Sequence, residues 1–384
     1  MKVNIFGSTG YIGKKSLEII INYFPDLKIN LLCANRNINI LEKQIKIYKP
    51  KYVYLFDEKK LKDLKKIITK NTKILNKNDL FIYLNNTKSD FTVLAVSGHK
   101  SLNYFESIIK NTKFLGLVSK ECIVSAGHIF TKYTKNNNIK IFPLDSEHFA
   151  MNQLFDFSKK YFHLNKIYLT ASGGPFLNQN YKDLKNVTFN QAINHPIWSM
   201  GYKNSLDSAT LVNKCLELIE AHYLFDIPFN KLDILIHPQA LVHSIFEFKN
   251  YVTNMVYFYH DMSIPLFNFF NQKFNYVPKK INNYNFKKNN FLKFSPIKKR
   301  HYPIYDFFNN LDKNDPKNII KFNMANEFAV NLFKNKKIIY TDIFKIIKKF
   351  TFLNLYSSVN TNKEVIDYHN EFEQKLNSVY AYKK

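Results

Sequence analysis

The sequence predicts an α/β protein with three parts: an N-terminal doubly wound, Rossmann-like domain, a middle α+β domain and a C-terminal helical domain. The length of 384 residues, at roughly 150 residues per domain, allows two to three domains. Residues 2–6 form an apolar run that is followed by a glycine-rich turn and a helical pattern. Apolar runs then alternate with Lys-rich amphipathic stretches, which is typical of a parallel sheet covered by helices on both faces.

The N-terminal domain is expected to span residues 1–140. Its strands should be the short apolar runs at 2–6, 28–34, 51–56, 91–96, 114–119 and 139–144. The amphipathic segments between these runs predict the helices of successive βαβ units. The chain has only 9 glycines, yet several of them cluster after the first strand. Such clustering indicates that the backbone there adopts a conformation or makes a close approach that requires glycine.

The amino-acid composition of the chain changes after the last of these strands. Gly, Ser, His, Asp and Trp gather between residues 145 and 215, and strand-like runs follow at 232–237 and 243–259, which predicts a second, functional domain over 141–270. Residues 271–300 are polar and punctuated by Pro, as in a linker. Helical spacing at 319–333 and 341–350 predicts a small helical domain over 301–384.

Composition excludes a disordered or collagen-like chain, since 46% of the residues are hydrophobic and 16% aromatic. No apolar run approaches the about 20 residues that a membrane span needs, and the first residues enter a strand directly. We therefore expect no membrane partner and no secretory signal. Cys33, Cys122 and Cys215 make no C-x-x-C pair, which favours a reducing cytoplasm.

The balance of 56 Lys and Arg against 30 Asp and Glu, a net charge of +26, raises the alternative of a nucleic-acid-binding protein. However, only Arg36 and Arg300 are arginines, and the lysines are spread along the chain among Asn, Ile, Tyr and Phe. This pattern is typical of drift in an A+T-biased genome. We expect no nucleic-acid partner.

The turn G-x-x-G-x-x-G at residues 7–13 predicts a dinucleotide site, because glycines let backbone amides approach a pyrophosphate in front of a helix N-terminus. The alternative is a structural turn. After the second strand the chain has Asn35, Arg36 and Asn37, where an NAD enzyme usually carries an acid. A guanidinium suits a 2′-phosphate, so NADP is favoured over NAD, although Arg36 could also be a simple exposed side chain.

Asp145 and Glu147 follow the strand at 139–144 and can point the same way at a sheet edge. Their hard oxygen atoms suit Mg²⁺ or Mn²⁺, but such a pair alone is more often solvated.

The stretch 205–221 is expected to begin at an N-cap-like Asp-Ser and continue as one helix. Asn213 and Lys214 fall on one face with Glu217, which offers an anion site and a third carboxylate. The alternative is an exposed Lys–Glu pair.

Two further features favour a phosphorylated ligand and a mobile loop, and two histidines stay ambiguous. Ser172 opens a Gly-Gly turn after a strand, as in a second phosphate site. His195-Pro-Ile-Trp198-Ser-Met200-Gly201 holds the only Trp between Pro and Gly, which predicts a lid, although a lone Trp is more often core. His237 and His243 can each be structural, hydrogen-bonded histidines.

These residues together resemble the 1-deoxy-D-xylulose 5-phosphate (DXP) reductoisomerase family. Seven motifs occur in that family's order along the whole chain: GSTGYIG at 7–13, PLDSEH at 143–148, SGGPF at 172–176, HPIWSMG at 195–201, SLDSAT..NK..E at 205–217, HPQ..VHS at 237–244 and MANE at 324–327. The resemblance implies an NADP-binding N-terminal domain, a catalytic middle domain that also builds a homodimer, and a C-terminal helical domain. It also implies a role in isoprenoid precursor synthesis.

The resemblance further implies roles for particular residues. The metal ligands would be Asp145, Glu147 and Glu217. The substrate-binding residues would be Lys120, Ser146, Glu147, Ser172, His195, Ser208, Asn213, Lys214 and Glu217. The cofactor-binding residues would be Gly7, Ser8, Thr9, Gly10, Tyr11, Ile12, Asn35, Arg36, Asn37, Ser119, Glu121 and Gly201. The catalytic residues would be Lys120, Glu147, His195, Trp198, Met200 and His243.

The implied reaction converts DXP, a small phosphorylated sugar, to 2-C-methyl-D-erythritol 4-phosphate with NADPH and one divalent cation, Mg²⁺, Mn²⁺ or Co²⁺. The cation would act as a Lewis acid in the carbon-skeleton rearrangement, and NADPH would reduce the resulting aldehyde. The chain departs from the family pattern on the cofactor side, at Tyr11, Asn35, residues 97–100 and Ser119. An NADPH-dependent reductase without isomerisation is the alternative enzyme, and a metal requirement distinguishes the two.

Overall fold

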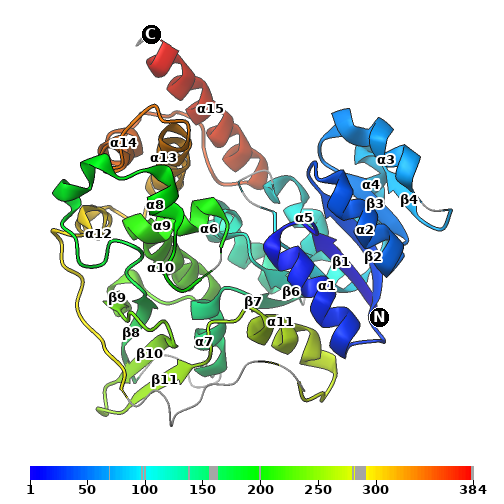
Figure 1. The fold of residues 1–384 in the computed structure, drawn as a ribbon, viewed down its shortest axis with the longest axis horizontal. Coiled ribbons are helices and arrows are strands. Elements are labelled where there is room, and N and C mark those ends of the chain that lie inside the picture. The colour runs from blue at the N-terminus through cyan, green and yellow to red at the C-terminus, as the bar shows by residue number, and fades with distance from the viewer. Residues whose placement is uncertain are drawn as a thin grey trace. The chain divides into compact units, whose positions relative to one another are not determined.

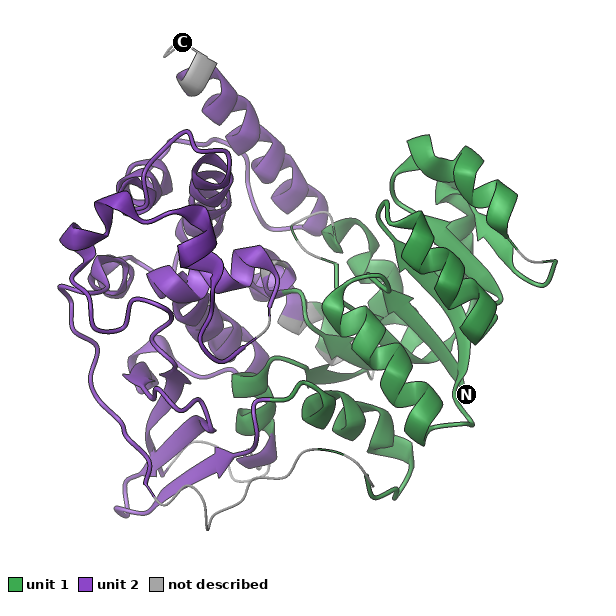
Figure 2. Cartoon of the chain, viewed as in Figure 1, with its two compact units in different colours: residues 1–119, 132–152, 261–282 green, residues 120–131, 153–260, 283–384 purple. Residues whose placement is uncertain are grey.

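The computed structural model describes residues 1–68, 70–96, 98, 101–136, 139–154, 163–198, 200–278, 281 and 291–381. Contacts between Cα atoms divide the chain into two compact units (Figure 2). The first contains residues 1–119, 132–152 and 261–282, and the second contains residues 120–131, 153–260 and 283–384. Among the described residues, no helix has both the length and the apolar character that crossing a bilayer demands.

The first unit is built on a seven-stranded sheet with the order β4-β3-β2-β1-β5-β6-β7 (Figure 1). All its neighbouring strands are parallel, and the strand order reverses between β1 and β5. The expected doubly wound architecture is therefore confirmed. The strands are β1 (Lys2–Phe6), β2 (Lys28–Ala34), β3 (Tyr52–Leu55), β4 (Lys73–Leu75), β5 (Ser89–Leu94), β6 (Thr112–Leu117) and β7 (Lys140–Pro143). Strand β4 was not predicted, because a three-residue edge strand is too short for a periodic signal.

Helices follow most of these strands, as the amphipathic stretches predict. They are α1 (Tyr11–Tyr23), α2 (Ile38–Tyr48), α3 (Leu61–Ile67), α4 (Lys77–Asn86), α5 (Leu102–Asn111), α6 (Lys120–Asn136) and α7 (Ser146–Leu154), with the 3₁₀ turn η1 (Glu58–Lys60). Their buried faces carry the apolar residues, for example Leu41 and Ile45 of α2, which lie four residues apart.

A helix from much later in the chain also covers this sheet. Helix α11 (Ser263–Phe270), followed by η5 (Asn271–Lys273), packs on α1, where the rings of Tyr23 and Phe267 meet edge to face with centroids 5.4 Å apart. The Phe269 ring contacts Phe91 of β5, at 5.4 Å between centroids. Gly116 of β6 makes room for it, because a Cβ there would lie 2.9 Å from the Phe269 ring. Residues 261–282 therefore pack with the N-terminal sheet.

The second unit contains a four-stranded sheet with the order β11-β10-β8-β9. Its strands are β8 (Leu164–Ala171), β9 (Leu232–Ile236), β10 (Val242–Phe248) and β11 (Thr253–Tyr257). The run at 243–259 is thus two antiparallel strands and not one, because Tyr251 adopts a positive φ of 65° and turns the chain. In the expected linker, Ser295 makes a β-bridge with Ile236.

Helices form the rest of the second unit. They are the first part of α6, residues 120–131, together with α8 (Phe189–Ile193), α9 (Tyr202–Thr210), α10 (Val212–Phe225), α12 (Pro303–Asn310), α13 (Pro316–Lys334), α14 (Asp342–Thr351) and α15 (Asn362–Ala381), with the 3₁₀ turns η3 (Tyr181–Asn186) and η4 (Phe229–Lys231). The two helices expected from spacing near the C-terminus are confirmed as α13 and α14. Helix α15 was not predicted, and its His369 ring lies 3.0 Å from the Ser125 hydroxyl of α6.

Candidate active site

The glycine turn lies in the first unit, at the carboxyl end of β1 beside the reversal of strand order. Gly7 has a φ of +83°, and a Cβ on it would lie 2.2 Å from the carbonyl oxygen of Ala95. The amides of Gly7 and Ser8 both donate to the Cys33 carbonyl at 2.9 Å. A Cβ on Gly13 would lie 2.3 Å from the Gly7 carbonyl oxygen. Only glycine therefore permits this turn, which brings backbone close to a ligand site at the sheet edge.

The other expected cofactor residues of this unit gather around the same edge. Thr9 and Ile12 are half-buried, and Gly10 and Tyr11 are exposed at the start of α1. The Ser8 hydroxyl is fully buried and has no hydrogen-bond partner among the described residues. It can therefore donate a hydrogen bond to an oxygen of a ligand. A dinucleotide fits this cradle. Burial, together with the charge of Asp261, raises the pKa of the Tyr11 phenol.

Residues 35–37 follow β2, and all three are exposed, with no acid among them. Asn37 caps α2, since its side chain accepts a hydrogen bond from the Ile40 amide at 3.1 Å. The guanidinium of the exposed Arg36 has no partner among the residues that the structure describes, and such a group suits a 2′-phosphate. Ser119 follows β6 and is buried, with its hydroxyl 3.4 Å from that of Ser101. The Glu121 side chain and residues 97, 99 and 100 lie outside what the structure describes.

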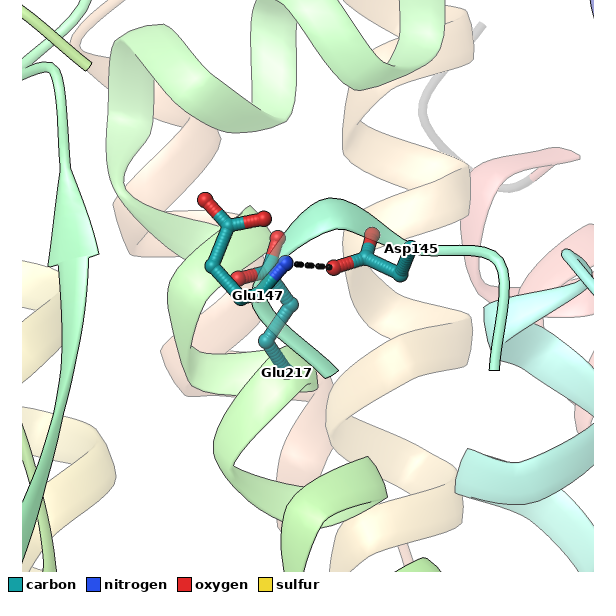
Figure 3. Close-up of side chains that lie close together, drawn as sticks. All are labelled: Asp145, Glu147 and Glu217. Atoms are coloured by element: carbon teal, nitrogen blue, oxygen red, sulfur yellow. Dashed lines mark hydrogen bonds between the residues drawn. The ribbon is translucent and has the colours of Figure 1, made fainter. Parts of the chain in front are cut away.

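Three carboxylates come together in the arrangement shown in Figure 3. Asp145 follows β7, Glu147 lies in the first turn of α7, and Glu217 lies on α10. One oxygen from each of the three lies within 4.8 Å of the others. The backbone amide of Glu147 donates to Asp145 Oδ1 at 3.3 Å, which ties the Asp145 carboxylate to the first turn of α7. The third carboxylate that the sequence left open is present, and this all-oxygen donor set fits Mg²⁺ or Mn²⁺.

Neighbouring side chains hold two of these carboxylates. The Ser146 hydroxyl donates to Glu147 Oε2, and His148 Nδ1 lies 3.5 Å from Asp145 Oδ1. Glu147 is largely buried and Asp145 is half-buried.

Glu217 is surrounded by donors. Its Oε1 accepts from Lys120 Nζ at 3.1 Å and from the Asn213 amide, and its Oε2 accepts from Lys214 Nζ at 2.6 Å. Lys120 also lies 3.6 Å from Glu220. Glu217 is 1% exposed, so the alternative of an exposed Lys–Glu pair is wrong. Two buried ammonium groups and two buried carboxylates here balance each other's charge.

The helix that carries these residues differs from the expectation. Leu211 has a φ of +70° and separates α9 from α10, so Asp207 and Ser208 lie inside α9 and do not cap a helix. Asp207 is buried and paired with Lys203, whose Nζ lies at 2.8 Å, which explains why an acid is tolerated inside the helix. The break starts a new helix, with Asn213 and Lys214 in its first turn.

The second glycine turn packs against α9. Gly173 and Gly174 have φ values of +88° and +64°, and a Cβ on Gly174 would lie 3.0 Å from the Ser208 carbonyl oxygen. The Ser172 hydroxyl accepts from the Gly174 amide at 3.2 Å and lies 3.0 Å from His195 Nε2. The structure thus brings Ser172, His195 and the Ser208 backbone into one region of the second unit.

The imidazole of His195 accepts hydrogen bonds from the backbone of the loop that follows it. Nδ1 accepts from the amides of Ile197 at 3.2 Å and Trp198 at 2.9 Å, so the proton of the neutral ring is on Nε2 and points to Ser172. Trp198 is half-buried outside any helix or strand, with its ring centroid 6.2 Å from His243 and 5.8 Å from His260. Met200 is also half-buried in this loop, and Gly201 is the N-cap of α9. Ser199 lies outside the described residues.

The two histidines of the 237–244 motif differ in their surroundings. His237 donates from Nδ1 to the Lys293 carbonyl at 2.9 Å and stacks on Phe294, which confirms a structural histidine. Burial lowers the pKa of His237. His243 stacks on Phe258 at 4.0 Å and faces the Trp198 ring.

Sequence reasoning missed two residues of this region. Glu220 lies one turn after Glu217, so helical spacing alone could have placed it on the same helix face as Glu217, whereas only the folded structure brings Lys120 beside it. His260 carries no recognisable motif, and only the folded structure places its ring against Trp198.

Comparisons with known proteins identify the family of the chain. A family model described as 1-deoxy-D-xylulose 5-phosphate reductoisomerase matches residues 3–127, and models of that enzyme's C-terminal domains match residues 141–225 and 259–376. The reductoisomerase of Pelagibacter ubique is 37% identical over 356 residues, covering 89% of this chain and 88% of its own. That of Wigglesworthia glossinidia brevipalpis is 38% identical over 367 residues, 91% of each chain.

Solved structures give the same result. The enzyme from Zymomonas mobilis in complex with NADPH matches with a TM-score of 0.88 and 29% identity, over 98% of both chains. A crystal structure of DOX-P reductoisomerase in complex with NADPH, fosmidomycin and magnesium matches with a TM-score of 0.91 and 27% identity, over 100% of this chain and 98% of that one. From its glycine turn to its C-terminal helices, this chain belongs to the 1-deoxy-D-xylulose 5-phosphate reductoisomerase family.

Proposed function

We propose that this protein is an NADP-dependent oxidoreductase that isomerises and reduces DXP to 2-C-methyl-D-erythritol 4-phosphate, a step of isoprenoid precursor synthesis. The observation that carries the proposal is the set of three carboxylates, Asp145, Glu147 and Glu217, with oxygens within 4.8 Å of one another. A simple NADPH-dependent reductase has no need of such a set. Family membership supports the same reaction.

The three carboxylates would hold one divalent cation, with Mg²⁺, Mn²⁺ or Co²⁺ as candidates. When bound, such an ion supplies a Lewis acid that polarises the oxygens of the substrate. The ammonium groups of Lys120 and Lys214 now neutralise Glu217. A cation on Glu217 would take over that role and leave both ammonium groups to meet substrate oxygens.

The phosphate of the substrate would bind in the second unit. Candidate donors there are Ser172, His195, Ser208, Asn213 and Lys214, of which Asn213 and Lys214 lie in the first turn of α10, whose N-terminus favours an anion. His195 Nε2 carries a proton toward Ser172, so the pair offers donors to phosphate oxygens. Binding energy from this non-reacting group would hold the reacting carbons in place. Ser146 and Glu147 would contact the substrate's other oxygens.

NADPH would bind at the glycine turn of the first unit. Residues 7–12 bring backbone amides to the pyrophosphate, and Arg36 meets the 2′-phosphate beside Asn35 and Asn37. Ser119, Glu121 and Gly201 are further candidate contacts. Trp198, Met200 and His243 would cover the reacting atoms and exclude water.

The proposal includes a homodimer. Strand β11 pairs only with β10 among the described residues, and it ends the sheet beside Tyr251, which is 96% exposed, and the exposed Val252 and Met255. An open strand edge with apolar side chains favours pairing with a second copy. Sedimentation equilibrium tests this, and a monomer at micromolar concentration would contradict it.

We also propose a cytoplasmic location and the domain division at residues 140, 270 and 300. All three cysteines are buried, and none of them forms a disulfide with another described residue, which suits a reducing compartment. Limited proteolysis should cut between residues 271 and 300 before any other region. Stable fragments that end elsewhere would contradict the division.

One assay tests the central proposal. NADPH oxidation is followed at 340 nm with DXP, in the presence of Mg²⁺ or Mn²⁺ and after treatment with a chelator. We expect turnover that the chelator abolishes and the cation restores, with 2-C-methyl-D-erythritol 4-phosphate as the product. Turnover in excess chelator would favour the reductase without isomerisation. Salt-sensitive polynucleotide binding that competes with NADPH would favour the nucleic-acid alternative.

A further inference from the structure

Helix α9 is tied to α13 by a buried pair of side chains. Asn326 donates from its amide nitrogen to Asp207 Oδ1 at 2.9 Å, across 119 positions of sequence. Lys203 Nζ donates to the other oxygen, Oδ2, at 2.8 Å. Asp207 is 1% exposed and Asn326 is fully buried. The carboxylate is therefore satisfied by one ammonium group and one amide, and water cannot replace either of them at low cost.

This contact adjoins the residues that are expected to bind phosphate. Asp207 directly precedes Ser208, and the left-handed residue Leu211 ends α9 four positions after Asp207. Asn213 and Lys214 begin the next helix. A displacement of Asp207 along or around α9 would therefore move all the expected phosphate ligands of this segment.

Helix α9 also lies in close contact with the second glycine turn. A Cβ on Gly174 would lie 3.0 Å from both the Ser208 carbonyl oxygen and the Ala209 Cα, so the turn and the helix are already in close backbone contact. Tyr302 holds the turn from behind by donating to the Gly173 carbonyl at 2.7 Å. The distance between Ser172 and Ser208 thus depends on a helix position that Asn326 controls.

We propose that Asn326 is a positioning residue for phosphate binding, acting through Asp207. It lies in the Met324–Glu327 motif, to which the proposed mechanism assigns no role, and it gives α13 a function in the site. The inference rests on the proposed function, because it takes the anion of the second unit to be the substrate phosphate. Asn326 touches no substrate atom.

The test compares Asn326→Leu with a matched control on the same helix. Asn323 is also fully buried, but its amide donates to Glu327 of α13 itself, at 3.2 Å, and not to α9. Both substitutions remove a buried amide, so a merely structural role predicts similar effects for both. Inorganic phosphate binding is measured by ³¹P NMR titration, fosmidomycin binding with Mg²⁺ by calorimetry, and NADPH binding by cofactor fluorescence.

We expect Asn326→Leu to weaken phosphate and fosmidomycin about tenfold, to raise KM for DXP more than it lowers kcat, and to leave NADPH affinity within about twofold. Asn323→Leu should lower the melting temperature without this selective loss. The double variant Asp207→Asn with Asn326→Asp exchanges donor and acceptor, and it should recover most of the phosphate affinity that the single Asn326→Asp change loses.

Phosphate affinity of Asn326→Leu equal to that of the wild type would overturn the inference. The same follows if Asn323→Leu loses phosphate affinity equally, if the exchanged pair fails to recover it, or if the wild type binds no phosphate. A wild type that binds inorganic phosphate but does not turn over DXP would refute the proposed function alone.

Discussion

Replacing Glu217 by Gln separates the metal-binding role of this residue from its part in a buried ionic cluster. Its carboxylate accepts from Lys214 at 2.6 Å, from Lys120 at 3.1 Å and from the Asn213 amide. The substitution keeps the shape of the side chain but removes one negative charge between two ammonium groups. Lys120 still faces Glu220, at 3.6 Å, but both ammonium groups lose the charge of Glu217.

The structure gives magnitudes for both effects. Breaking a buried ion pair by neutralising one partner costs about 3 kcal/mol of unfolding free energy at the lower end of the usual range, since Gln still accepts a hydrogen bond. Loss of a charged metal ligand should reduce kcat about 100-fold or more. A divalent cation at 100 times its Kd should stabilise the wild type by about 2.7 kcal/mol, and Glu217→Gln should gain much less.

Glu220→Gln is the matched control. Glu220 lies one turn along α10, is 3% exposed and faces Lys120 at 3.6 Å, so its neutralisation leaves the same excess of positive charge. It is not one of the three clustered carboxylates. Thermal unfolding of the wild type and both variants, with and without Mg²⁺ or Mn²⁺, is measured beside NADPH oxidation. Glu220→Gln should lose stability but keep its stabilisation by the cation.

An equal loss of cation-induced stabilisation in Glu217→Gln and Glu220→Gln would refute the assignment of Glu217 as a ligand. Unchanged turnover of Glu217→Gln would do the same. Wild-type stability that does not respond to either cation would contradict the metal site as a whole.

Three further predictions concern cofactor choice, the Trp198 loop and pH. Arg36→Ala should weaken NADPH binding about tenfold to a hundredfold while NADH changes by less than about twofold, as cofactor fluorescence titrations would measure, and equal losses would mean that Arg36 does not read the 2′-phosphate. Fluorescence emission from Trp198, the only tryptophan, should shift when fosmidomycin and Mg²⁺ are added. Trp198→Ala should impair turnover more than it impairs fosmidomycin binding. A blue-shifted emission that the ligand leaves unchanged would indicate that Trp198 is a fixed core residue and not part of a lid. In the folded protein, burial lowers the pKa of His128, His222 and His237 from the ordinary value of 6.5. The unfolded chain therefore binds more protons than the folded protein below pH 6.5, and the melting temperature should fall as the pH drops from 7 to 5.5. A constant melting temperature would contradict these shifts.

Local sequence determined the elements whose signals lie within a few residues. The glycine turn is an example, because the left-handed φ of Gly7 and the close approach of Gly13 demand glycine wherever a helix follows a strand so tightly. The same is true of Asn213, Lys214 and Glu217, since helical spacing alone puts them on one face. Strand runs buried on both sides were also readable from their apolar residues.

Tertiary structure decided the features that join distant segments. No local pattern states that Lys120 bonds Glu217 across 97 positions, or that α11 returns to cover the N-terminal sheet. The break at Leu211 was equally invisible, because an apolar residue in a helical pattern carries no signal for a left-handed backbone. Spacing and propensity act over a single turn or strand, whereas burial and charge balance depend on which surfaces the whole chain brings together. The three carboxylates of the cluster could therefore be named from sequence, but their burial and their partners could not.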